Sequence, residues 1–111
     1  MTKLMIVSSG SEMDKTAVEL YAALLKISGY ETMSDWDNPF GENPIETDAD
    51  ILIVQGRGDE NWFMDMIPDG KPTIFITTLG IPVVKQGQHV LIIKDGMDLP
   101  DAIRIQENFL K

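Results

Sequence analysis

The chain has 111 residues, no cysteine and a formal net charge of −9 at pH 7. This length fits a single domain over residues 1–111 that buries its own core, and the lack of cysteine excludes disulfides, thiolate metal sites and thiol catalysis. The negative charge repels phosphate backbones, so we expect no nucleic-acid partner.

No apolar run approaches the roughly 20 residues that span a bilayer, and the first residues do not form a signal peptide. We therefore expect a cytoplasmic protein without a membrane partner. Two interpretations of the acidity remain open. One is a well-solvated surface, which the even spread of acidic residues favours, and the other is a docking face for a basic protein or a mimic of nucleic acid.

The first predicted elements are a strand, a turn and a helix. Residues 3–8 are almost entirely apolar, as in a strand buried on both faces. Ser11 and Asp14 form a capping box, and Gly29 is placed to end the helix. The apolar stripe that we expect to pack on the sheet is Met13, Ala17, Leu20, Leu24 and Ile27.

The sequence after the first helix predicts a weak strand and then three further strands. Residues 30–36 form the weaker strand, which we expect near an edge of the sheet, and turn-forming residues fill 37–48. The further strands are 51–54, 73–77 and 90–93, with a short helix at 61–67 and no full helix within 78–89. We expect the side chain of Asp98 to cap the final helix, whose sheet-facing residues are Leu99, Ala102, Ile103, Ile105 and Phe109.

This order predicts an α/β domain with a three-layer, doubly wound arrangement of the flavodoxin-like or Rossmann-like type. Because crossovers between strands are right-handed, the five strands should be parallel in the order 2-1-3-4-5, with shortened helices after the second and fourth strands.

Ligands of such sheets bind beyond the carboxyl ends of the strands. The loop after the first strand offers amides and hydroxyls at a helix N-terminus, although Glu12 and Asp14 offset its positive end. Arg57 and Lys94 supply positive charge, and Trp62 offers a ring for stacking. The candidate ligand-binding residues are Ser8, Ser9, Gly10, Ser11, Gln55, Gly56, Arg57, Gly58, Trp62, Thr77, Thr78 and Lys94.

Motifs for catalysis are not found in the sequence. His89 is the only histidine, no G-x-S-x-G elbow occurs, and the loop after the first strand is no P-loop. We therefore expect neither catalytic nor metal-binding residues, and we favour a protein that is not an enzyme.

With these elements the chain resembles the receiver domains of response regulators. In receivers an acidic pair follows the first strand, a phosphorylatable Asp ends the third, a Thr or Ser ends the fourth and a Lys ends the fifth. Here Thr77 or Thr78 and Lys94 fit the last two positions, whereas Ser8 and Ser9 replace the acidic pair and Gln55 replaces the acceptor. The resemblance implies a non-catalytic regulatory or protein-interaction domain with a protein partner, no cofactor and no Mg²⁺ site.

Two partial resemblances imply an alternative function. Residues 49–98, with Gly70-Lys71-Pro72 and Gly80-Ile81-Pro82, look like the nucleotide-sugar-binding half of GT-B glycosyltransferases, without their paired glutamates. Residues 8–31 are similar in spacing to the phosphate loop and first helix of flavodoxins. The alternative is a domain that binds a nucleotide-sugar or FMN through the loop after the first strand.

Overall fold

The computed structural model describes residues 2–8, 12–35, 48–56, 67–68, 70–77, 80–81 and 83–110. Five strands form one sheet: Lys3–Ser8 (β1), Glu31–Asp35 (β2), Ile51–Gly56 (β3), Pro72–Thr77 (β4) and His89–Ile93 (β5). Two α-helices and two single 3₁₀ turns are described with them: Glu12–Ile27 (α1), Gly96–Asp98 (η2), Leu99–Glu107 (α2) and Asn108–Leu110 (η3).

The strands are all parallel and lie in the order β2-β1-β3-β4-β5, which confirms the predicted doubly wound, flavodoxin-like α/β topology. β2 lies at an edge, also as predicted. The two central strands β3 and β4 are buried along their whole length, which explains why apolar residues occur on both faces of each strand.

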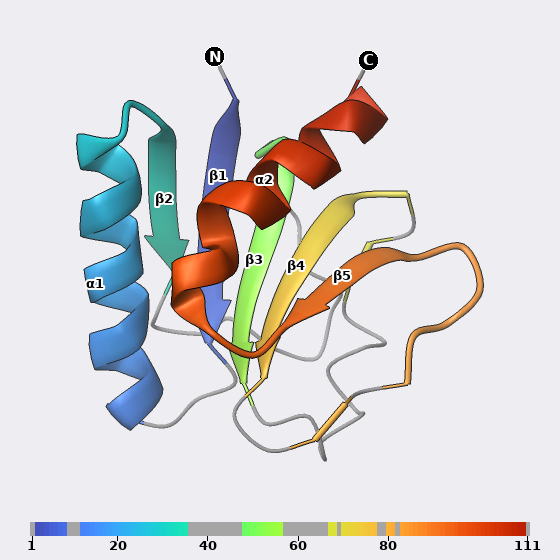
Figure 1. Ribbon diagram of the computed structural model, residues 1–111, viewed down its shortest axis with the longest axis horizontal. Helices are drawn as coiled ribbons and strands as arrows, with labels where there is room; N and C mark the ends of the chain where they lie inside the picture. The colour runs from blue at the N-terminus through green and yellow to red at the C-terminus, as the bar shows by residue number, and fades with distance from the viewer. Residues whose placement is uncertain are drawn as a thin grey trace.

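Both α-helices cover the same face of the sheet (Figure 1). They share one buried cluster with strand residues that alternate along β1, β3 and β4. Its members are Leu4, Ile6, Val18, Ala22, Leu25, Ile51, Ile53, Ile74, Ile76, Leu99, Ala102 and Ile103.

The other face of the sheet carries a second buried cluster, formed by Val7, Leu52, Val54 and Phe75 with Ile67. The predicted loop at 37–48 and short helix at 61–67 fall almost entirely outside the described residues. Residues 80–81 and 83–88, between β4 and β5, contain no helix, in agreement with the expected short connection.

The predicted burial of Leu20, Leu24 and Ile27 is wrong. These side chains are 56%, 52% and 83% exposed, and α1 instead buries Val18, Ala22 and Leu25. The helix carries two neighbouring apolar stripes, and the buried one has the small Ala22 at its centre. A small residue lets a helix approach the sheet closely, whereas spacing alone cannot tell which of two stripes does so.

The predicted apolar stripe of the final helix is correct for three of its five residues. Leu99, Ala102 and Ile103 are buried, but Ile105 and Phe109 are exposed, and Phe109 lies beside the His89 ring with centroids 4.8 Å apart. The side chain of Asp98 makes no capping hydrogen bond to α2, contrary to prediction. Asp95 caps the preceding η2 turn by accepting a hydrogen bond from the Met97 amide at 2.9 Å.

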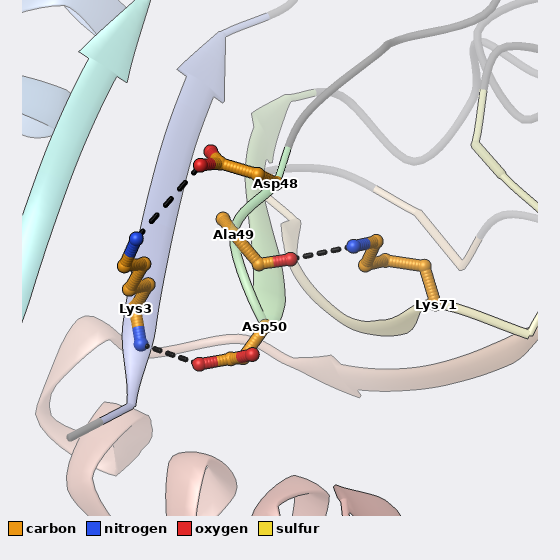
Figure 2. A network of polar contacts seen from close by, with 5 residues as sticks. All are labelled: Lys3, Asp48, Ala49, Asp50 and Lys71. Carbon is orange, nitrogen blue, oxygen red and sulfur yellow. Dashed lines mark hydrogen bonds and ion pairs between the residues drawn. The ribbon is translucent and has the colours of Figure 1, made fainter.

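The starts of three strands are fastened together at the amino edge of the sheet (Figure 2). The Lys3 amide donates to Asp50 Oδ2 and the Asp50 amide donates to the Lys3 carbonyl, both at 2.8 Å. Lys3 Nζ lies 3.8 Å from Asp48 Oδ2, and Lys71 Nζ donates to the Ala49 carbonyl at 2.5 Å. These contacts connect β1 to β3 and the residue before β4 to the start of β3, which fixes their register.

Candidate functional site

The carboxyl edge of the sheet brings several of the predicted site residues together. Gln55 lies opposite Ser8 on one side and Ile76 on the other, and Gly56 lies opposite Thr77. α1 begins at this same end of the sheet (Figure 1). From β1 the chain continues to β2 on one side of the sheet, and from β3 it continues to β4 on the other side. Doubly wound sheets bind ligands where these two directions diverge, and Gln55 lies at that point.

The remaining predicted site residues are only partly described. Lys94 directly follows Ile93, the partner of Ile76, so it lies near Thr77 along the edge, and its side chain is exposed. Seven of the candidates lie outside the described residues: Ser9, Gly10, Ser11, Arg57, Gly58, Trp62 and Thr78. Ser11 is also the first residue of the expected capping box.

Thr77 and Gln55 are both buried at this edge but differ in their hydrogen bonding. The Thr77 hydroxyl donates to the Gly80 carbonyl, so it connects the end of β4 with Gly80. Gln55 is only 4% exposed, and its Oε1 has no hydrogen-bond partner among the described residues. Thr77 is therefore committed to the fold, whereas the Gln55 oxygen is available for a further donor.

Metal binding has no support within the described ranges. No group of three or more His, Cys, Asp or Glu side chains there could hold a metal ion. In the same part of the chain, no helix is long and apolar enough to cross a membrane.

A second candidate site is an apolar groove of about 230 Å³ between α1 and the η2 turn. It is lined by Tyr21, Leu24, Leu25, Ser28, Gly96, Met97, Leu99 and Pro100. The Tyr21 ring lies so close to Gly96 that a Cβ there would overlap it. Glycine is thus what allows η2 to approach α1 and form the floor of this groove.

Exposed apolar side chains continue from this groove along the outer surface of α1. Leu24 borders the groove, Leu20 lies one turn earlier, and Ile27 and Met97 are 83% and 85% exposed. We call Leu20, Leu24, Ile27, Met97 and the groove the α1–η2 face. Sequence reasoning missed this face because it assigned Leu20 and Leu24 to the core, and the signal that reveals it is the second apolar stripe of α1.

Charge borders the α1–η2 face on the η2 side. Asp95 and Asp98 flank Met97 in the chain and are both exposed. On α1, the outward positions Thr16 and Ala23, which accompany Leu20, Leu24 and Ile27, are also uncharged and exposed. The face is therefore an uncharged strip that Asp95 and Asp98 border on its η2 side.

The amino edge holds an open hollow of about 560 Å³, lined by Thr2, Ser28, Gly29, Tyr30, Asp50, Glu107 and Leu110. Thr2 Oγ1 donates to Glu107 Oε2 at 3.1 Å, and the Tyr30 hydroxyl donates to Glu107 Oε1 at 3.5 Å. Burial raises the pKa of Tyr30, and the negative charge and hydrogen bond of Glu107 raise it further. Both Glu107 oxygens are thus used to connect α2 with β1 and β2, which indicates a structural role.

In comparisons with known proteins, no protein-family model, no curated protein and no solved structure matches the chain.

Proposed function

We propose that the chain is a receiver-like protein-interaction domain that does not transfer phosphate and binds its partner through the α1–η2 face. The observation that carries the proposal is the outward surface of α1, where Leu20, Leu24 and Ile27 are exposed beside an apolar groove. A helix that packs on its own sheet with one stripe normally presents polar residues on the opposite side. Contiguous exposed apolar side chains are typical of surfaces that another molecule covers.

The chemistry of the partner follows from charge. The chain carries a net charge of −9, and Asp95 and Asp98 border the apolar strip. A second copy would bring the same acidic residues together, which opposes self-association. The partner that fits is an amphipathic segment whose apolar side chains enter the groove and whose Lys or Arg residues face the aspartates.

The absence of phosphotransfer is inferred from the residue types at the carboxyl edge. In a receiver a carboxylate at the end of the third strand accepts the phosphoryl group, and Gln55 offers an amide there. An amide is no nucleophile for phosphorus, and Ser8 and Gln55 carry no charge that would hold Mg²⁺. After incubation with acetyl phosphate and Mg²⁺, we expect an unchanged intact mass. A mass increase of one phosphoryl group that disappears when one residue at this edge is substituted would contradict this part of the proposal.

The interaction surface is tested with a peptide of the stated chemistry. We would titrate ¹⁵N-labelled protein with a short helical peptide in which leucines form one face and lysines the other. We expect saturable amide shifts in α1 and η2, centred on Leu24 and Met97, and weaker binding at higher salt. The control is a peptide of identical composition in scrambled order, which cannot form an apolar face. Equal shifts with the scrambled peptide, or shifts centred on another surface, would contradict the proposal.

A further inference from the structure

The side-chain amide of Gln55 differs from the other buried polar side chains among the described residues. Each of those has a hydrogen bond to a backbone carbonyl; they are Thr32, Thr73, Thr77 and Gln106. The closest comparison is Gln106, which is also buried and whose Nε2 donates to the Thr73 and His89 carbonyls at 2.5 and 3.1 Å. Gln55 Oε1 is the buried side-chain atom in this part of the chain that has no such partner.

The side of the sheet on which Gln55 lies follows from the strand alternation. Ile51 and Ile53 belong to the cluster under α1 and α2, so Gln55, two residues further along β3, is on that same side. It lies between Ser8 of β1 and Ile76 of β4, at the end of the sheet where α1 begins. The orphaned acceptor thus lies at the carboxyl edge, on the side of the sheet that α1 and α2 cover.

A buried acceptor without a donor destabilises a fold, whereas an apolar side chain of the same shape at this position would not. The neighbouring strand residues Ile53, Ile74 and Ile76 are all apolar, so packing alone does not demand glutamine here. We propose that Gln55 is the hydrogen-bonding contact of a small-molecule site at the carboxyl edge, with a neutral cyclic amide or imide as its ligand.

The ligand class follows from the chemistry of a primary amide. Its oxygen accepts a hydrogen bond and its NH₂ group donates, so the matching edge has an N–H next to a C=O. The surroundings of Gln55 favour a neutral ligand, because burial penalises charge. The positive end of α1 would attract an anion, but the sequence puts Glu12 and Asp14 in its first turn, which offsets that attraction. This site is independent of the α1–η2 face and adds a second binding function.

The first test uses stability and a matched pair of substitutions. Gln55→Met removes the amide with little change in shape, and we expect its Tm to rise by roughly 3–10 °C, since the unpaired oxygen is gone. Gln106→Met is the control: it removes the two hydrogen bonds that the buried Gln106 amide donates, so its Tm should fall. A fall in Tm for Gln55→Met similar to that of Gln106→Met would show that the amide is satisfied within the protein, by bound water for example, and would overturn the proposal.

The second test uses 1-methyluracil and 1,3-dimethyluracil as probes, since they differ only in the replacement of the N3–H donor by a methyl group. With 1-methyluracil at millimolar concentrations, we expect saturable amide shifts at the ends of β1, β3 and β4 and of the Gln55 side-chain NH₂. With 1,3-dimethyluracil, or with the Gln55→Met variant, the affinity should be at least about tenfold lower, as expected for loss of one buried hydrogen bond. No saturable shift with 1-methyluracil, or equal affinity for both probes, would overturn the proposal. Neither test involves the α1–η2 face, so its outcome is separate from that of the protein-interaction proposal.

Discussion

Two adjacent leucines of α1 provide a stability test of which side of the helix faces the sheet. Leu25 is 4% exposed and belongs to the cluster with Leu4 and Ile51, whereas Leu24 is 52% exposed. Leu25→Ala leaves a cavity in that cluster, so we expect it to lower the free energy of unfolding by about 2–5 kcal/mol. Leu24→Ala removes a half-exposed side chain, whose partial burial contributes about 1 kcal/mol at most.

Urea unfolding monitored by circular dichroism measures both changes. With a slope of about 1–3 kcal/mol per molar urea, the midpoint of Leu25→Ala should fall by roughly 1 M or more, while that of Leu24→Ala should move much less. The two alanine variants have the same composition and nearly the same helix propensity, so each serves as the control for the other. Equal losses, or a larger loss for Leu24→Ala, would refute the assignment of Leu24 to the solvent-facing surface and with it the α1–η2 face.

Two further predictions concern single contacts. Gly96→Ala places a Cβ against the Tyr21 ring, so it should lower the free energy of unfolding by about 1–3 kcal/mol. In the Tyr21→Leu background, calorimetry should show a smaller loss from Gly96→Ala, and equal losses in the two backgrounds would contradict the overlap. For Tyr30, burial and Glu107 raise the pKa above the ordinary 10.0, so the unfolded chain loses its proton first and stability should fall as the pH rises past about 10. Urea unfolding across that range should show less of this fall in Tyr30→Phe, and an equal fall in the variant would contradict the assignment.

The topology could be predicted from the sequence because it depends on local signals. Apolar residues occur on both faces of the runs at 51–54 and 73–77, which is typical of strands that are buried on both sides. Helix-connected strands are parallel, and right-handed crossovers leave few possible orders. The position of Gln55 at the carboxyl edge follows from the topology alone, so this part of the candidate site was also predictable.

The features that could not be predicted depend on contacts between residues that are distant in the sequence. The buried stripe of α1 is chosen by its fit to the sheet, and both stripes have the same spacing. Gln106 of α2 can be buried because the carbonyls of Thr73 in β4 and His89 in β5 accept hydrogen bonds from its amide. Likewise, the groove exists because Gly96 lies against Tyr21, and the sequence around neither residue predicts this contact.

Calorimetric titration of the leucine–lysine peptide into two matched variants tests the central claim most directly. Leu24→Glu places a charge on the α1–η2 face, and Ile105→Glu places the same charge on α2 at a site of similar exposure, 50% against 52%. We expect the affinity of Leu24→Glu to fall about tenfold or more, because a charge in an apolar contact loses hydration without gaining a partner. The affinity of Ile105→Glu should match that of the unsubstituted protein. Equal affinities of the two variants would contradict the claim that α1 and η2 form the docking surface.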